Sequence, residues 1–262
     1  MILFGDKKKQ YYKGILIKAD LRLHEQITDK LLLLRPPTSN IRVLDLGSGE
    51  GALSQRLVDL GYTIYAADIN QDDFKCDKAI FLQVDFNDES AINELKTHYK
   101  DYFDIVLGVE VIEHLENPWQ YIRLLKSLLK PDGLLLVTTP NTASWFSRLV
   151  FLRHGKFHGF FDYNLSYGHI APISPWELKL IMSREGFKDI HIEPAGTLPD
   201  IWIRPSMKLL IVNLIGFLFR PFMRGISGGW CIMATGLKDG ESVLAISQSA
   251  PSSAPALHRK DQ

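Results

Sequence analysis

The sequence lacks an excess of charge of either sign. It has 30 Lys and Arg residues against 30 Asp and Glu residues, so its formal net charge is zero. A domain that binds nucleic acid through the phosphates usually carries a basic surplus or a basic stripe. The chain also has no stretch in which aromatic and basic residues alternate, as single-stranded nucleic acid would favour. We therefore expect no nucleic acid partner.

Cysteine is scarce, and an N-terminal targeting signal is missing. Cys76 and Cys231 are far apart in the sequence and have no metal-binding spacing, which is typical of a reducing cytoplasm. Asp6 and the lysines at 7–9 interrupt the N-terminus before an apolar segment develops. This composition predicts no signal peptide, and we expect a cytoplasmic protein.

The most informative segment that is present is Val-Leu-Asp-Leu-Gly-Ser-Gly-Glu-Gly at residues 43–51. An expected strand at 41–46 leads into this glycine-rich turn, and an expected helix at 52–60 follows it. Glycines allow a tight turn and a close approach of ligand to the backbone. The start of the helix offers unpaired N–H groups to an anionic ligand.

A second predicted strand, at 63–69, carries Asp68 near its end, about 20 residues past the glycine turn. An acidic side chain at that distance typically binds the hydroxyls of a ribose. The two strands and the turn therefore predict an α/β unit that binds a nucleoside.

Strands and helices alternate along the middle of the chain, which predicts a mostly parallel sheet with helices on both faces. A chain of 262 residues is long enough for one large domain of this class. Further strands are expected at 79–86, 103–111, 134–139, 188–193 and 230–237. Further helices are expected at 91–99, from Asn117-Pro118 to Pro131, and from Ser174 to Gly186.

Three segments differ from this pattern. Residues 142–173 are rich in aromatic residues and histidine, and we expect them to form a lid or substrate cap. Residues 198–227 are a strongly apolar insertion before the last strand. The tail at 240–262 repeats Ser, Ala and Pro and is predicted to be disordered. Residues 1–239 are then a single domain.

The glycine spacing distinguishes between nucleoside ligands. Dinucleotide sites have G-x-G-x-x-G, whereas this chain has D-x-G-x-G-x-G from Asp45 to Gly51. This pattern resembles the first motif of class I S-adenosylmethionine (SAM) methyltransferases. The resemblance covers roughly residues 40–195 and the last strand, and includes Phe-Asp-Ile-Val at 103–106, Pro-Asp-Gly-Leu at 131–134 and Thr-Thr-Pro-Asn at 138–141. It implies a Rossmann-like, doubly wound sheet of seven strands, mostly parallel, with the last strand antiparallel.

The same resemblance implies which residues bind SAM. Asp68 corresponds to the ribose-binding position of the family, and Asp85 with the backbone N–H of Phe86 to the adenine-binding position. Asp45 either contacts the ligand or only holds the loop, and the sequence leaves both open. The predicted cofactor-binding residues are Asp45, Gly47, Gly49, Asp68, Ile69, Asp85, Phe86 and Val109.

Residues 110–114, Glu-Val-Ile-Glu-His, directly follow the fourth strand. If a helical turn begins at Glu110, the side chains of Glu110, Glu113 and His114 share one face. Two carboxylates and an imidazole are good ligands for a divalent cation. The segment resembles the E-x-x-E-H signature of ubiquinone-pathway O-methyltransferases and of small-RNA terminal 2′-O-methyltransferases. In those families these positions bind Mg²⁺ or a similar ion, and His169 is the candidate for a fourth ligand here.

E-x-x-E-H also occurs in relatives with no known metal, in which the histidine acts as a base or only orients a loop. We predict His114 and Glu113 as catalytic residues, with or without a cation. The RNA enzymes carry a longer histidine-containing pattern downstream, which this chain lacks in recognisable form. That difference weakens both the fourth-ligand prediction and the RNA interpretation.

The apolar insertion is almost unbroken from Leu209 to Phe219 but is shorter than the ~20 apolar residues that span a bilayer. Its flanks carry basic and aromatic residues, which suits a segment lying in a membrane interface through 201–224. The alternatives are a buried cap helix and a homodimer contact. The flanking residues are Trp202, Arg204, Lys208, Arg220 and Arg224.

The first functional hypothesis is O-methylation of a hydroxyl on a small-molecule, lipid-linked or glycan acceptor. The chain looks similar to bacterial methyltransferases found with glycan and cell-envelope synthesis. The alternatives are a catechol O-methyltransferase for a quinone precursor at the membrane surface, a non-catalytic SAM-binding partner protein, and an RNA methyltransferase. The expected location is the cytoplasm, or the inner face of the membrane as a peripheral protein.

Overall fold

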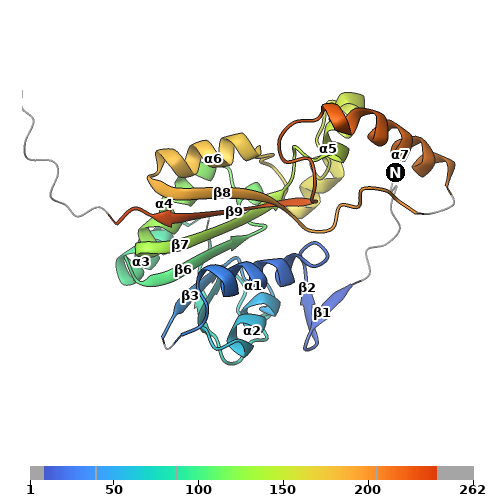
Figure 1. The fold of residues 1–262 in the computed structure, drawn as a ribbon. Coiled ribbons are helices and arrows are strands. Elements are labelled where there is room, and N and C mark those ends of the chain that lie inside the picture. The colour runs from blue at the N-terminus through green and yellow to red at the C-terminus, as the bar shows by residue number, and fades with distance from the viewer. Residues whose placement is uncertain (1–8, 39, 87, 204–205, 241–262) are drawn as a thin grey trace, which may run out of the picture.

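The computed structural model describes residues 9–38, 40–86, 88–203 and 206–240. Its centre is a seven-stranded sheet in the order β5-β4-β3-β6-β7-β9-β8 (Figure 1). Strand β9 is antiparallel to both of its neighbours, whereas the pairings among β3, β4, β5, β6 and β7 are all parallel. This topology confirms the predicted fold. The strands are β3 (Arg42–Leu46), β4 (Thr63–Asp68), β5 (Ile80–Gln83), β6 (Phe103–Val109), β7 (Leu129–Pro140), β8 (Phe187–Ala195) and β9 (Cys231–Lys238).

Helices cover both faces of the sheet, because successive strand residues point to opposite sides. Leu44 and Leu46 of β3 face a core cluster that includes residues of α3 (Glu89–Tyr99), α4 (Pro118–Leu128) and α6 (Pro175–Arg184). Val43, the residue before Leu44, faces the other cluster, with α1 (Leu23–Leu34) and α2 (Ala52–Asp59). The core therefore has two layers, one on each side of the sheet.

Two helices begin where the sequence predicts, because the preceding residue supplies a side-chain cap. The Asn117 side chain accepts a hydrogen bond from the Gln120 amide at 3.0 Å, and proline is the first residue of α4. Ser174 accepts from the Glu177 amide at 3.1 Å in the same way, ahead of the proline that begins α6. These caps define the residues at which α4 and α6 begin.

Several boundaries differ from the predictions. Strand β5 ends at Gln83 rather than 86, and β7 begins at Leu129 rather than 134. Strand β6 ends at Val109 rather than 111. Glu110 adopts a left-handed φ of 56°, and this conformation is incompatible with a continuing strand. The N-terminal part contains three elements that the sequence did not predict, namely β1 (Gln10–Tyr12), β2 (Ile15–Ile17) and α1.

The expected lid and the apolar insertion lie together at one end of the molecule (Figure 1). The lid contains α5 (Trp145–His154) and a 3₁₀ segment, η2 (Asp162–Tyr167). The insertion contains α7 (Met207–Phe219), followed by η3 (Arg220–Phe222). In the described residues, no helix combines the length and apolarity needed to cross a membrane. The tail predicted to be disordered falls outside the described residues from 241 onward, as does Arg204.

Candidate functional site

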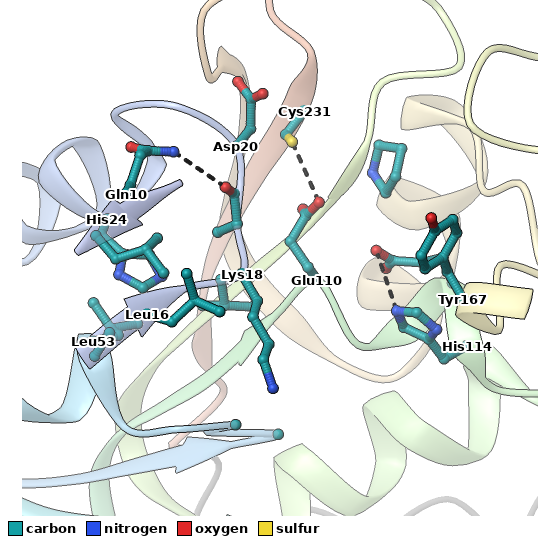
Figure 2. A pocket seen from close by; sticks show the side chains of 18 of the residues that line it. Gln10, Leu16, Lys18, Asp20, His24, Leu53, Glu110, His114, Tyr167 and Cys231 are labelled. Carbon is teal, nitrogen blue, oxygen red and sulfur yellow. Dashed lines mark hydrogen bonds and ion pairs between the residues drawn. The ribbon is translucent and has the colours of Figure 1, made fainter. Parts of the chain in front are cut away.

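A cleft of about 750 Å³ lies at the carboxyl ends of β3 and β6, where ligands bind in open α/β sheets. The parts of the chain that line it include the glycine turn, the N-terminal hairpin and the loop after it, the segment after β6, the lid, and the start of β9 (Figure 2). Lys18, Glu110 and His114 come from three of these parts and surround the same space in Figure 2. Segments far apart in sequence therefore build one site.

The glycine turn has the conformation that its sequence predicts. Gly47 has a φ of 82°, and a Cβ there would lie 2.4 Å from Cγ2 of Val111, so no larger residue fits. Gly49 has a φ of 53°, and no atom lies within 4 Å of the position its Cβ would take. The backbone at Gly49 is therefore open to a ligand in the cleft.

Asp68 supports this turn from the end of β4. Its Oδ2 accepts a hydrogen bond from the Gly49 amide, and its Oδ1 accepts from the Ile69 amide, both at 2.8 Å. Each carboxylate oxygen has two lone pairs, so Asp68 keeps acceptor capacity for a hydroxyl. Asp85 and Phe86 follow β5, the neighbour of β4 in the sheet, and both are half-buried. Gly47, Gly49 and Val109 line the cleft, while Asp68, Ile69, Asp85 and Phe86 lie outside its lining.

Asp45 lines the cleft but is nearly inaccessible, with 2% of its surface exposed. Its Oδ2 accepts a hydrogen bond from the Ser54 hydroxyl at 2.6 Å. Burial raises the pKa of Asp45 to about 6, and the bond from Ser54 opposes that shift. Asp45 therefore holds the strand to the following helix across the turn.

The helical turn expected from Glu110 begins two residues later, as the 3₁₀ segment η1 (Ile112–His114). The left-handed Glu110 lies before it, so the predicted common face of Glu110, Glu113 and His114 is wrong. The Glu110 carboxylate instead accepts a hydrogen bond from the Thr138 hydroxyl at 3.0 Å. It also accepts one from the Cys231 thiol at 3.4 Å (Figure 2).

Glu113, His114 and His169 do come together, each offering one ligand atom within 4.8 Å of the others. Glu113 is fully buried, and its Oε2 accepts from the Thr139 hydroxyl at 3.0 Å. Its Oε1 has no hydrogen-bond partner among the described residues and lies 4.0 Å from Nε2 of His114. The two imidazoles meet edge to face, with centroids 4.9 Å apart.

Burial sets the protonation of this cluster. It raises the pKa of Glu113 well above the usual range, and the neighbouring Glu110 charge adds to the effect. Burial also lowers the pKa of His114, and the neighbouring His169 lowers it further. Nδ1 of His169 lies 2.9 Å from the Gly159 carbonyl, which favours the tautomer with the proton on Nδ1 and leaves Nε2 as an acceptor. At neutral pH these shifts favour two neutral imidazoles.

The lid contributes His158, Gly159, Asn164 and Tyr167 to the cleft wall. Gly168 is required beside them, because a Cβ there would lie 2.9 Å from Nδ1 of His114. Sequence reasoning missed the rest of the wall, which includes residues 9–10 and 16–20, His24, Trp230 and Cys231. The strands of the hairpin have three residues each, which is too short for a periodic signal.

Comparison with known sequences identifies relatives. The family described as "Methyltransferase domain" matches residues 19–192. A ubiquinone biosynthesis O-methyltransferase of Caulobacter sp. (strain K31) is 33% identical over 111 residues, which are 41% of this chain and 44% of that protein. A protein of the same name from Ruegeria pomeroyi is 32% identical over 117 residues, or 43% of this chain and 46% of that protein. The matches thus span less than half the length of these curated relatives.

Solved structures resemble this chain over most of its length. A SAM-dependent methyltransferase from Archaeoglobus fulgidus has a TM-score of 0.56 at 23% identity, covering 82% of this chain and 94% of that one. A possible histamine N-methyltransferase from Thermotoga maritima has a TM-score of 0.53 at 15% identity, covering 83% and 91%. At these identities the likeness shows a common fold.

Proposed function

Because this chain belongs to the methyltransferase-domain family and is a class I SAM-dependent methyltransferase, we propose that it methylates a hydroxyl oxygen of a small molecule or glycan unit. The observation that carries the proposal is one cleft lined by both the glycine turn and the Glu113–His114 pair. A hydroxyl must lose its proton as it is methylated, and this pair offers a proton acceptor beside the cofactor turn.

The residues of the turn fit SAM. Gly49 leaves its side of the cleft open, and Asp68 retains acceptor capacity beside it. When bound, SAM supplies a methyl group already activated by its sulfonium centre. The chain then has to orient the acceptor, exclude water and accept one proton. A cleft of about 750 Å³ shared by cofactor turn and lid favours turnover over a non-catalytic SAM-binding role, which would require a blocked acceptor pocket.

His114 is the proposed base. Its lowered pKa keeps the imidazole neutral at pH 7, so that it can take the hydroxyl proton. Glu113 lies beside it, with Oε1 at 4.0 Å from Nε2, so that the imidazolium that forms and the carboxylate form of Glu113, which burial disfavours, would stabilise each other. Thr139 holds the other carboxylate oxygen, which fixes the orientation of Glu113.

The proposal also includes a divalent cation held at this cluster. Oε1 of Glu113 is buried without a hydrogen-bond partner in the described part of the chain, and it lies close to the nitrogens of His114 and His169. One carboxylate and two imidazoles suit a borderline ion such as Mn²⁺ or Fe²⁺ better than Mg²⁺, which prefers oxygen ligands. Such an ion would lower the pKa of a coordinated hydroxyl and fix its direction.

A quinone-precursor catechol is the second candidate acceptor. The relatives in Caulobacter and Ruegeria are named ubiquinone biosynthesis O-methyltransferases, which favours this class. The lid supports an aromatic acceptor, because Tyr167 lines the cleft and Phe160 packs against His169 with ring centroids 5.6 Å apart.

The test is incubation of the protein with methyl-labelled SAM and separated lipid, glycan and RNA fractions. Label in a small-molecule, glycan or lipid-linked hydroxyl is the expected result, and label in the quinone-containing lipid fraction would select the second candidate. Label in RNA, or in no fraction from protein that binds SAM, would overturn the proposal.

A His114→Ala variant separates chemistry from binding. Turnover should fall by about 10²–10⁴-fold while SAM affinity, measured by calorimetry, stays near wild type. His98→Ala, on the exposed side of α3, is the matched control and should retain both. An equal loss of turnover and affinity in His114→Ala would reject the assigned role. Stimulation by Mn²⁺ or Fe²⁺ that disappears in His169→Ala would support the cation.

A further inference from the structure

The outward face of α7 is apolar. Leu209 and Gly216, seven residues apart, are its buried positions and face the protein. The opposite side carries large apolar side chains at intervals of three and four residues, which places them on a single face. These residues and their exposed fractions are Met207 72%, Leu210 61%, Ile211 50%, Leu214 57%, Phe217 76% and Leu218 55%. An exposed patch of this kind marks an interaction site.

Neighbouring elements extend the patch. Helix α5 packs against α7 through Trp145 and Gly216, and contributes the exposed Phe151 and Leu152. Phe222 of η3 and Ile203 add further exposed apolar area. A groove of about 320 Å³ follows α7 and is lined by Ile201, Leu210, Asn213, Leu214 and Phe217, with Asp200 and Arg220 at its polar side. We call this combined face of α5, α7 and η3 the α5–α7 surface.

The charged residues in the segments that form the α5–α7 surface are mostly basic. The sequence has no Asp or Glu between residues 142 and 161 or between 201 and 238. Asp200 pairs with Arg220 at 2.6 Å, and it is the acidic side chain that lines the groove. Since the whole chain has a net charge of zero, this local surplus selects an anionic partner. The basic residues of these two segments include Arg148, Arg153, Lys208, Arg220 and Arg224.

The length of α7 defines how it can meet such a partner. Its 13 residues extend about 20 Å, whereas the hydrocarbon core of a bilayer is about 30 Å thick. An apolar helix of this length with basic residues at its ends can lie in the plane of a bilayer, with the apolar face among the acyl chains and the cations among the headgroups. A second copy of this chain would have to bring acidic side chains to the same surface. Residues 201–238 contain none.

We propose that the α5–α7 surface docks flat on an anionic phospholipid bilayer. Aromatic side chains connect this surface to the cleft. Trp202 packs on Phe146 at 5.3 Å between ring centroids, and Phe146 packs on His158 at 5.1 Å. His158 lines the cleft. The docked protein thereby presents its cleft to an acceptor carried by the membrane, and this last point rests on the proposed function.

Vesicle flotation tests the docking without SAM or acceptor. The probes are vesicles of phosphatidylcholine alone and of phosphatidylcholine mixed with phosphatidylglycerol. Wild type should float with the mixed vesicles and bind the neutral ones on the order of tenfold more weakly. The double variants Leu214→Ser/Phe217→Ser and Lys208→Glu/Arg224→Glu should each lose on the order of tenfold in partition into the mixed vesicles. All four positions are exposed, so both variants should fold.

Leu33→Ser is the matched control, because Leu33 on α1 is 75% exposed, nearly the same as Phe217. It should float like wild type. Equal flotation of wild type and both double variants, or no flotation with mixed vesicles, would overturn the docking. A dimer in sedimentation velocity that Leu214→Ser/Phe217→Ser dissociates, without vesicle binding by wild type, would assign the surface to a second copy. Loss of label transfer with intact flotation would instead reject the proposed function alone.

Discussion

The hydroxyl of Ser54 donates a hydrogen bond to the carboxylate of Asp45 over 2.6 Å, and both side chains are buried. Asp45 belongs to β3 and Ser54 to the first turn of α2, so the bond joins the two elements on either side of the glycine turn. The geometry of the cofactor turn therefore depends on a polar pair that water does not reach.

Ser54→Ala should destabilise the protein by about 1–3 kcal/mol, because the buried Asp45 loses its side-chain donor. The lost bond stabilises the charged carboxylate, so the pKa of Asp45, about 6 in the wild type, should rise further. The deficit in unfolding free energy should then be larger at pH 8 than at pH 4, as measured by urea denaturation. Ser127→Ala, which removes a bond to a backbone carbonyl on α4, is the control. An equal deficit at both pH values would contradict this account.

Asp68→Ala should weaken SAM binding by about tenfold or more. The substitution removes the proposed ribose acceptor and also releases the Gly49 and Ile69 amides that the carboxylate holds. Isothermal titration calorimetry measures the affinity. Asp73→Ala, which removes an exposed carboxylate bonded only to Asn70 among the hydrogen bonds described, should leave it unchanged. Wild-type affinity in Asp68→Ala would exclude the ribose contact.

Gly216→Ala should loosen the contact between α7 and α5. Alanine raises helix propensity by about 1 kcal/mol, but its Cβ would lie 2.8 Å from Cζ3 of the buried Trp145. Overpacking of this kind typically costs about 1–3 kcal/mol, so we expect a lower melting temperature and tryptophan emission at longer wavelength. Ile211→Ala, on the outward face of α7, should change neither. A higher melting temperature in Gly216→Ala would show that the propensity gain prevails.

His24 predicts a pH dependence of stability. Burial, together with the Arg56 charge, lowers its pKa from 6.5 to about 4. Between these values the unfolded chain binds more protons than the folded one, so stability falls as the pH decreases. From pH 7 to pH 4 the wild type should lose roughly 3 kcal/mol more unfolding free energy than His24→Gln. The exposed His191→Gln should behave like the wild type, and a parallel pH profile in His24→Gln would contradict the assignment.

The parts of the fold that the sequence predicts are those with a strong local signal. The strands β3, β4 and β6 are mostly apolar, and α4 and α6 begin with side-chain caps that need particular residue types. Helix α1 has no such signal, because Arg22 at its N-cap is left-handed and makes no capping bond. The lid helix α5 is apolar on several sides, so its period does not appear in the sequence.

The candidate site also has parts that the sequence predicts and parts that it does not. The glycine turn and the pair of Glu113 and His114 follow from motifs after the ends of strands, whereas His169 comes from the lid and was a candidate through the resemblance. The conformation of Glu110, which takes this residue off the helical turn, could not be predicted, because a left-handed φ is uncommon for a residue with a side chain. The wall formed by the N-terminal residues depends on contacts across the whole chain, such as Asp20 accepting from the Thr197 amide at 2.9 Å. No local pattern encodes a contact of that range.

The hairpin of β1 and β2 forms a two-stranded sheet of its own beside the seven-stranded one. At its tip, Tyr12 and Lys13 both contact Asp59 on α2. The Tyr12 hydroxyl lies 2.9 Å from Oδ2 of Asp59, and Nζ of Lys13 lies 2.8 Å from the same oxygen. Because its ladder is separate, loss of the contacts at Asp59 would change the wall of the cleft that residues 16–18 form without breaking any hydrogen bond of the seven-stranded ladder.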